Sequence, residues 1–253
     1  MTISSILRRL LPSALRPLEL ATRRYLCWSK CIVQSGPFQG LKYIRQSHCS
    51  ALTPKIAGTY ERELFPFLER LIASKPDAFI DIGAAEGYYV VGAAVAGWSP
   101  RIIAFESDPH ARESLLALAN LNGLPPERIT LHEACTPRSL DTLLASCKNP
   151  AVILDTEGFE ALLLDPLRLP NLKKARFIVE YHDFILPGLR DVLIERMQAT
   201  HNIEIIGQSP RTADELSCTD PILRLFPASI RLRLLSESRP PERHGWLWME
   251  PRT

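Results

Sequence analysis

Short apolar runs alternate with longer segments of helical periodicity over most of the chain. Runs rich in Ile, Val and Ala predict strands at residues 78–82, 101–105, 129–132, 151–154, 175–179, 203–206 and 245–249. Apolar residues recur at helical spacing before and between these runs, at residues 60–72, 87–96, 109–121, 139–146, 159–167 and 186–200. Because parallel neighbours need a crossover long enough to hold a helix, this order predicts a doubly wound, mostly parallel seven-stranded α/β sheet.

Two stretches depart from this rhythm. Residues 1–57 precede the first regular segment and are expected to form a helical or irregular appendage to a main domain at residues 58–253. Residues 207–242 contain five prolines and predict an irregular insertion within that domain. The strand predicted after this insertion, at residues 245–249, is compatible with an antiparallel edge strand or a hairpin.

Basic residues gather at the front of the chain. Residues 1–60 carry nine Lys or Arg and a single acid, Glu19, whereas the whole chain has a formal charge of only +2. Leucines and arginines interleave over residues 4–33, and this broken basic amphipathic pattern could lie on an anionic membrane surface as a peripheral contact. We favour the alternative that these leucines pack on the main domain or on a partner subunit.

The location predicted for the protein is the cytoplasm. Prolines and arginines interrupt the apolar stretches near residues 10–20, so neither a transmembrane helix nor a secretory signal is predicted there. The six cysteines are scattered, and the one close pair, Cys27 and Cys31, has no second pair or nearby histidines to complete a zinc site. We therefore expect reduced thiols.

The first predicted strand runs into a glycine turn, from Asp81 through Gly83, Ala84 and Glu86 to Gly87. Glycines let the backbone approach a ligand closely, and the helix that follows offers unpaired N–H groups. A dinucleotide-binding loop would carry a further glycine where this chain has Ala85. The acids of the loop would repel a pyrophosphate and attract an ammonium or sulfonium group, although a tight turn without a ligand remains an alternative.

The second predicted strand ends in Glu106, nineteen residues after Gly87. In a doubly wound sheet this position lies beside the first loop, where a carboxylate can accept hydrogen bonds from two ribose hydroxyls. Glu106, with Ser107 next to it, therefore indicates a nucleoside without saying which one. For Asp108, which precedes Pro109, helix capping and ligand contact are both open.

The fourth and fifth predicted strands end in Asp155 and in Glu180, His182 and Asp183. Because histidine side chains titrate near neutral pH, His182 suits the general base that a hydroxyl acceptor needs, with Asp155 and Glu180 as further candidate catalytic residues. Asp155 is also placed to contact the ammonium group of a bound cofactor. These residues and Asp183 could alternatively hold a divalent metal, a reading that we rank below the base, so no metal is predicted. Helix capping by Asp155 and a structural role for His182 stay open.

Six ordered segments resemble the signatures of FkbM-type class I methyltransferases. They are DIGAAEGYY (81–89), AFESDP (104–109), NLNGL (120–124), SLDTLL (139–144), LDTEGFE (154–160) and VEYH (179–182). Similar family members have a Lys where this chain has Ile153, which leaves a family-specific charge arrangement in doubt. The resemblance implies a Rossmann-like fold and S-adenosylmethionine as cofactor. It places Asp81, Gly83 and Gly87 at the methionine part, Glu106 at the ribose, and Glu133 with Ala134 near the adenine.

The function expected from these features is methylation of a hydroxyl on a small molecule, a glycan or a lipid-linked intermediate, the substrate class that the resemblance implies. An NAD-binding oxidoreductase and a non-catalytic cofactor-binding module are the alternatives. Nucleic acid is not an expected partner. Enzymes that methylate bases commonly carry Asn or Asp followed by two prolines and an aromatic residue after the fourth strand, where this chain reads DTEG (155–158).

Overall fold

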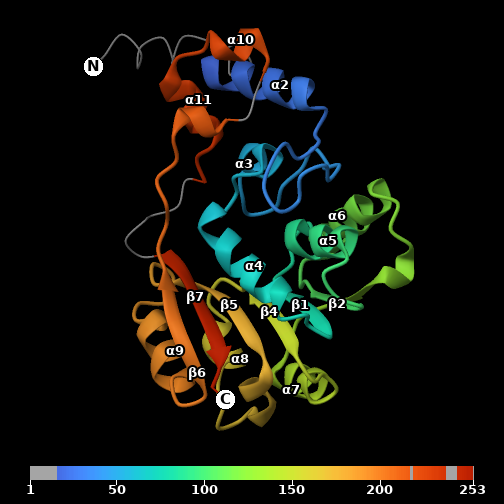
Figure 1. Cartoon of the computed structure of the whole chain (residues 1–253), viewed down its shortest axis with the longest axis vertical. Helices are drawn as coiled ribbons and strands as arrows, with labels where there is room; N and C mark the ends of the chain where they lie inside the picture. The colour runs from blue at the N-terminus through green and yellow to red at the C-terminus, as the bar shows by residue number, and fades with distance from the viewer. Residues whose placement is uncertain (1–15, 217–218, 238–243, 253) are drawn as a thin grey trace. The chain divides into compact units, whose positions relative to one another are not determined.

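A seven-stranded sheet in the order β3-β2-β1-β4-β5-β7-β6 organises the computed structural model, which describes residues 16–216, 219–237 and 244–252. The strands are β1 (Ala78–Ile82), β2 (Arg101–Phe105), β3 (Ile129–His132), β4 (Pro150–Leu154), β5 (Arg176–His182), β6 (His201–Ile206) and β7 (His244–Pro251). Strands β1 to β5 pair in parallel, whereas β7 runs antiparallel between β5 and β6 (Figure 1). This is the Rossmann-like class I methyltransferase fold and confirms the predicted fold class, although β7 lies inside the sheet and not at its edge.

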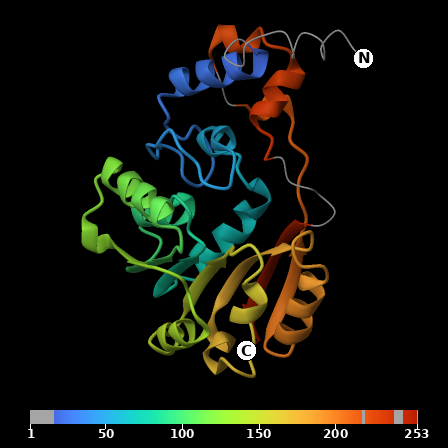
Figure 2. The same ribbon diagram turned by 180° about the vertical axis from the view of Figure 1, so that it is seen from behind.

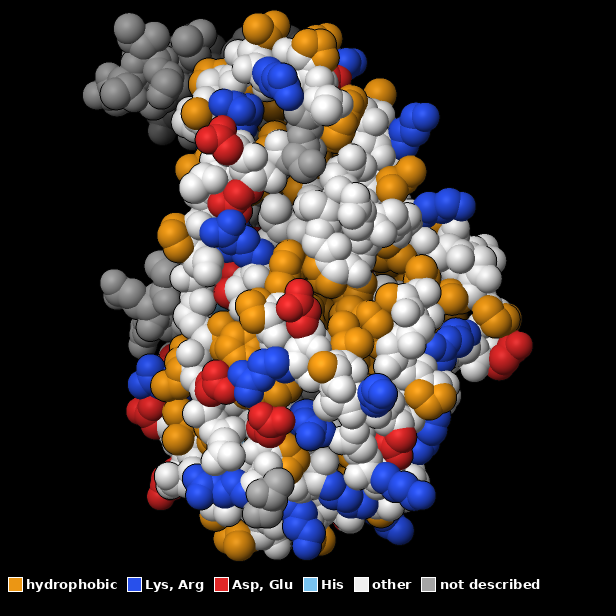
Figure 3. All heavy atoms as spheres, in the orientation of Figure 1, with side chains coloured by type: hydrophobic (Ala, Val, Ile, Leu, Met, Phe, Trp, Pro, Cys, Tyr) orange, Lys and Arg blue, Asp and Glu red, His pale blue; other side chains and the backbone are white. Residues whose placement is uncertain are grey.

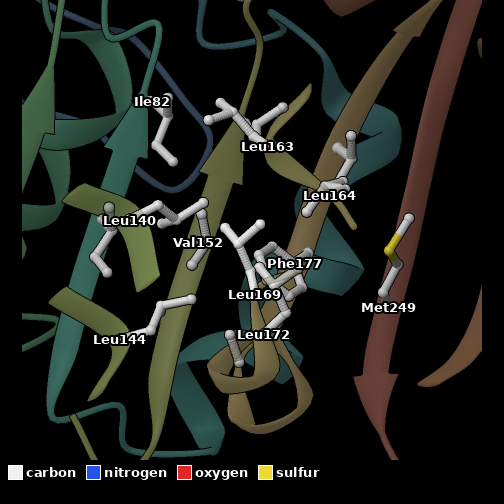
Figure 4. Close-up of a cluster of buried hydrophobic side chains, with 14 of the residues drawn as sticks. Ile82, Leu140, Leu144, Val152, Leu163, Leu164, Leu169, Leu172, Phe177 and Met249 are labelled. Carbon is white, nitrogen blue, oxygen red and sulfur yellow. The ribbon is translucent and has the colours of Figure 1, made fainter. Parts of the chain in front are cut away.

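Helices cover both faces of the sheet. On one face α7 (Pro137–Ala145), α8 (Glu160–Leu163) and α9 (Leu189–Met197) pack leucines and Met197 against alternate strand residues such as Val152 and Phe177 (Figure 4). Because strand side chains alternate, Trp248 of β7 points to the other face, where it meets Phe67 of α4 (Phe65–Ala73) at 5.9 Å between ring centroids. Helix α4 lies in front of the sheet in Figure 1, and α8 lies in front of it in Figure 2.

The central strands are apolar because both of their faces are covered. Every residue of β1 and of β4 is buried, which explains why these segments are near-continuous apolar runs and do not alternate. Most residues of helix α5 (Tyr88–Ala96) are buried, and the helix contacts β1, β2 and β3. Helix α6 (Pro109–Leu121) packs beside α5. The buried Asp81 in β1 is thus an exception that needs a local reason.

Several predicted elements differ from the structure in length, and two of them bear on the site. The helix expected at residues 159–167 is a single turn, α8, because Pro166 disfavours the helical conformation at Asp165; Leu167 beyond it is 98% exposed. Strand β5 continues to His182, three residues beyond the predicted end. Glu180 and His182 therefore belong to the strand itself, which fixes the face of the sheet on which their side chains lie.

The chain divides into two compact units, a sheet unit (residues 63–209 and 239–253) and a helical unit (residues 1–62 and 210–238). The helical unit contains α2 (Pro17–Ser29), α3 (Leu52–Ala57), α10 (Pro221–Arg224) and α11 (Ala228–Leu234). Helices α10 and α11 contact α2, and Arg24 forms an ion pair with Asp220. Short 3₁₀ turns are η2 (Arg62–Leu64), η3 (Pro126–Arg128), η4 (Pro170–Lys174) and η5 (Ala213–Glu215). The first half of the basic amphipathic pattern, residues 1–15, lies outside the described residues.

Charges of both signs are interspersed on the face of the sheet unit shown in Figure 3. Arg70 of α4 pairs with Glu204 of β6 and Glu250 of β7, and all three side chains are exposed. Within residues 16–216, 219–237 and 244–252, none of the helices combines the length and the apolar character needed to cross a bilayer.

Candidate functional site

The candidate residues meet at one edge of the sheet unit. Parallel strands β1, β2, β4 and β5 all end at this edge, which is the position where open α/β sheets bind ligands. Because β7 runs antiparallel to β5 (Figure 1), its first residue lies at the same edge, and the register pairs His244 with His182. Side chains from distant parts of the sequence are thereby brought together.

The turn after β1 depends on glycine at two positions. Gly83 has φ +85°, and a Cβ there would lie 1.6 Å from the backbone oxygen of Asp155, so the turn approaches the end of β4 too closely for any side chain. Gly87 has φ +95° and begins α5; a Cβ there would lie 2.9 Å from side-chain atoms of Leu115 and Val91. Both glycines are thus required by the turn itself.

The turn is tied to the end of β2. Gly83 and Ala84 donate their N–H groups to the carbonyl oxygen of Phe105, at 2.9 and 3.1 Å. Ala85 adopts a left-handed conformation with φ +47°, and its N–H donates to Oε2 of Glu106 at 2.7 Å. An alanine in this region costs about 1 to 2 kcal/mol, so the surrounding hydrogen bonds hold it there.

Glu106 is buried, with 8% exposure, and is held at both oxygens. Oε2 accepts from Ala85, and Oε1 accepts from the N–H of Asp108 at 2.8 Å. Since each carboxylate oxygen has two lone pairs, one acceptor direction remains on each oxygen beside these two bonds. Asp108 itself caps α6 through the N–H of His110, which accounts for the capping alternative.

The other candidate cofactor residues divide into buried and exposed groups. Asp81, Ala84 and Glu86 are buried in and before the turn, with exposures of 3, 6 and 0%. Ser107, Glu133 and Ala134 are exposed after β2 and β3. Arg112 connects these two segments, because it donates to the carbonyls of Glu106 and Ser107 and lies 3.6 Å from Glu133.

The ends of β4 and β5 form a second group of residues. The register pairs Ile153 with Ile178 and Leu154 with Val179, so Asp155 follows as the neighbour of Glu180. Side chains two apart in a strand share a face, and Glu180 and His182 therefore point the same way. Asp155 also donates its N–H to the carbonyl of Ile82 at 2.9 Å, which joins this group to the turn after β1.

Five ionisable side chains, Asp155, Glu160, Glu180, His182 and His244, surround this point; we call them the His–carboxylate cluster. Nε2 of His182 lies 3.7 Å from Oδ1 of Asp155 and 3.6 Å from Oε1 of Glu180, and its Nδ1 lies 3.8 Å from Oε1 of Glu160. Nε2 of His244 contacts Oε1 of Glu180 directly. Four of the side chains are at most 7% exposed, and that of Asp155 is 31% exposed.

The cluster contains two residues that were not among the predicted site residues. Glu160 is fully buried and holds the loop after β4, since its carboxylate accepts from Thr156 and from the N–H of Gly158. Its position in a short run with Asp155 was the available signal. His244 precedes a segment rich in tryptophan, and the sequence contains nothing that marks it as a partner of Glu180.

One residue of the alternative metal set lies elsewhere. Asp183 accepts the N–H of Arg190 at 3.0 Å through Oδ1 and so holds the start of α9 (Leu189–Met197). The prediction joined Asp183 to Asp155, Glu180 and His182. The structure places the other three around the His182 ring in two sets, His182 with Glu180 and His244, and His182 with Asp155 and Glu160.

Comparison with known proteins finds similar solved structures at low sequence identity. No family model matches the chain, and no curated protein matches it. A precorrin-6y C5,15-methyltransferase from Geobacter metallireducens is 14% identical, over 73% of this chain and 88% of that one, with a TM-score of 0.45. An rRNA methylase from Streptococcus thermophilus is 13% identical, over 75% and 95%, with a TM-score of 0.46. At this level of similarity no activity is transferred, so the functional proposal rests on the residues of this chain.

Proposed function

We propose that this chain is an S-adenosylmethionine-dependent methyltransferase of the FkbM type, acting on a hydroxyl of a small molecule, a glycan or a lipid-linked intermediate. The observation that carries the proposal is the bond between Ala85 and Glu106, which fixes a carboxylate against a glycine turn. The acceptor directions that remain on Glu106 match two adjacent ribose hydroxyls. Ser107 lies next to this ribose position, and Glu133 and Ala134 are the residues proposed for the adenine.

The residues at the turn fit a cofactor that is positively charged near its reactive atom. Gly83 lets the turn approach the backbone oxygen of Asp155, which a Cβ would meet at 1.6 Å, and so keeps the end of β1 beside the end of β4. Asp81, Glu86 and Asp155 place carboxylates around the turn, and these favour a sulfonium and an ammonium over a pyrophosphate. S-adenosylmethionine supplies an activated methyl group on a positive sulfur. Asp81, Gly83, Ala84, Glu86 and Gly87 would border its methionine part.

The His–carboxylate cluster is the place proposed for the acceptor. Methylation of a hydroxyl forms an oxygen–carbon bond as the sulfur–carbon bond breaks, the sulfur keeps the electron pair, and the hydroxyl proton must leave. His182, Asp155 and Glu180 are the proposed catalytic residues because they hold the hydroxyl and receive its proton at this edge. Burial of His182 and Glu180 keeps water away and fixes their orientation, which favours alignment for an in-line transfer.

An NAD-binding oxidoreductase is the alternative that the sequence left open. The dinucleotide fold has the strand order 3-2-1-4-5-6, whereas this sheet inserts the antiparallel β7 between β5 and β6. Ala85 also stands where the second glycine of a dinucleotide loop is expected. Nucleic acid as an acceptor is disfavoured because carboxylates of the cluster would repel phosphates.

Isothermal titration calorimetry tests the cofactor directly. The full chain is expected to bind S-adenosylmethionine and S-adenosylhomocysteine with about micromolar affinity and to give no heat with NAD⁺ or NADH. Binding of NAD⁺ with no response to either sulfur compound would overturn the proposal. Incubation of the protein with methyl-labelled S-adenosylmethionine and cell extract then identifies the acceptor, and a binding protein that labels nothing would be a non-catalytic module.

A further inference from the structure

We propose that the His–carboxylate cluster binds one divalent transition-metal ion, with Nε2 of His182, Nε2 of His244 and Oε1 of Glu180 as its ligands. The three residues are buried, and their candidate ligand atoms lie within 4.8 Å of one another. Asp155 lies on the same side of the His182 ring, with Oδ1 3.7 Å from Nε2, but belongs to a second set of side chains with Glu160.

The distances from Nε2 of His182 to the carboxylate oxygens match the spacing of ligand atoms around a metal better than the length of a hydrogen bond. The distances of 3.6 and 3.7 Å from Nε2 of His182 exceed the length of an N–H···O bond. Two ligand atoms that each lie about 2.0 to 2.2 Å from a tetrahedral metal are roughly 3.4 Å apart. Small side-chain shifts would therefore bring His182 and Glu180 onto one ion, while His244 would move away from its contact with Glu180.

The charge and the ligand types select the kind of ion. With ionised carboxyls and neutral imidazoles, the five side chains of the cluster carry a formal charge of −3 in a largely buried place, and a divalent cation reduces this to −1. Mg²⁺ and Ca²⁺ prefer oxygen ligands alone, whereas two imidazoles with one or two carboxylates suit Zn²⁺ and its first-row neighbours. A zinc site with two histidines and one carboxylate also keeps a position open for a further ligand.

Other residues hold the two rings from behind. Nδ1 of His182 faces Glu160, whose oxygens are fixed by the backbone N–H groups of Thr156 and Gly158. The carboxamide of Gln208 lies 2.9 Å from Nδ1 of His244, and a carboxamide can satisfy either protonation state of that nitrogen. Outer partners of this kind orient metal-binding histidines and raise their basicity.

A cation here would also serve the proposed methyl transfer, and this role, unlike binding of the ion, rests on the proposed function. A divalent cation lowers the pKa of a hydroxyl that it binds. The acceptor proton would then pass to Asp155, the partly exposed member of the cluster, and onward to water. With the cation bound, His182 and Glu180 hold it and Asp155 alone receives the proton, while the methyl carbon moves from sulfur to oxygen as described above.

Metal binding is measured on the full chain without cofactor. The protein is freed of metal with a chelator and titrated with ZnCl₂ by calorimetry and with CoCl₂ by visible absorption. One ion per chain is expected for each, and MgCl₂ at equal concentration should not compete. His244→Ala and the isosteric Glu180→Gln should lose the Co²⁺ absorption, and Glu160→Gln should weaken Zn²⁺ binding about 10- to 100-fold. His201→Gln is the matched control, because His201 is also buried in a strand but bonds to the carbonyl of Ala175.

Folding and cofactor binding are checked on the same samples, so the two proposals can fail separately. Circular dichroism identifies any variant that does not fold, and such a variant is replaced by its isosteric partner. The metal site is overturned if the folded wild-type protein binds no Zn²⁺, even if it binds S-adenosylmethionine. It is also overturned if the His244→Ala and Glu180→Gln variants bind Zn²⁺ as tightly as the wild type. Stoichiometric Zn²⁺ binding without any S-adenosylmethionine binding supports the metal site and overturns the proposed function.

Discussion

The two halves of the candidate site are built in different ways. The half after β1 and β2 consists of main-chain geometry, with glycines at the close approaches and N–H groups that fix a single carboxylate, Glu106. The half after β4 and β5 consists of buried ionisable side chains, of which His182 has three carboxylates within 3.8 Å. One half is shaped by the backbone and the other by side-chain chemistry.

This difference predicts two kinds of failure. A substitution that alters the backbone of the first half should remove the place where the cofactor binds, and chemistry is then lost as a consequence. A substitution that removes a side chain of the second half should leave the cofactor bound and stop the reaction. Variants that do not separate in this way would show that the halves are not distinct in function.

The largest effect is expected from Gly83→Ala. The new Cβ would lie 1.6 Å from the Asp155 carbonyl oxygen, so the turn or the end of β4 must move. Binding of S-adenosylmethionine should fall below detection in calorimetry, and unfolding should become easier by about 1 to 3 kcal/mol. Gly97→Ala is the control, since Gly97 also has positive φ, at +69°, but has nothing within 4 Å of the added Cβ. Equal affinity in the two variants would contradict a role for the close approach.

The second effect concerns chemistry without binding. His182→Ala removes the central ring of the His–carboxylate cluster, and turnover should fall about 10²- to 10⁴-fold. The dissociation constant for S-adenosylhomocysteine should stay within about threefold, because Glu106 and the glycine turn are untouched. The exposed His110 serves as the control position, as His110→Ala. Full turnover by His182→Ala on the identified acceptor would remove His182 from the proposed catalytic residues.

A smaller effect is expected at Glu106. Glu106→Gln keeps the size of the side chain but removes its charge and one of the two oxygens that accept from Ala85 and Asp108, so affinity for S-adenosylmethionine should fall about 10- to 100-fold. The rate at saturating cofactor should change little, which is the reverse of the His182→Ala result. Glu113→Gln, at an exposed position of α6, supplies the charge-matched control. A loss of rate with unchanged affinity would contradict the assignment of Glu106 to the half of the site that binds the cofactor.

Most of the fold follows from the sequence because its signals are local. The strands at residues 78–82, 101–105 and 129–132 have the predicted bounds, since each is a short apolar run closed by turn or helix-start residues. The end of α8 was missed because the effect of Pro166 on Asp165 outweighs the apolar periodicity of that segment. The antiparallel direction of β7 was among the predictions, whereas its place between β5 and β6 was not, because strand order depends on tertiary pairing.

The two halves of the site also differ in how far they can be predicted from local sequence signals. The bond between Ala85 and Glu106 joins residues twenty-one apart, at the ends of neighbouring strands, and the motif spacing predicts that Glu106 lies beside the turn. The contact of Glu180 with His244 spans sixty-four residues and requires the antiparallel register of β5 and β7. Asp155, Glu180 and His182 could be proposed from their strand ends, whereas His244 could not.

The smallest effect is a change in thiol reactivity at Cys135, which adjoins the proposed adenine residues Glu133 and Ala134. Burial raises the pKa of this thiol to about 11, despite the lowering effect of a hydrogen bond to Ser139. At pH 8 only about one thiol in a thousand is then ionised, so alkylation should be slow and should rise about tenfold per pH unit up to pH 10. The exposed Cys49 is the internal reference in a mass-spectrometric measurement with iodoacetamide. If the adenine lies where we propose, saturating S-adenosylhomocysteine should slow alkylation of Cys135 severalfold and leave Cys49 unchanged. An unchanged alkylation rate at Cys135 would contradict the proposed adenine position at Glu133 and Ala134 and would leave only the glycine turn and Glu106 as the proposed cofactor site.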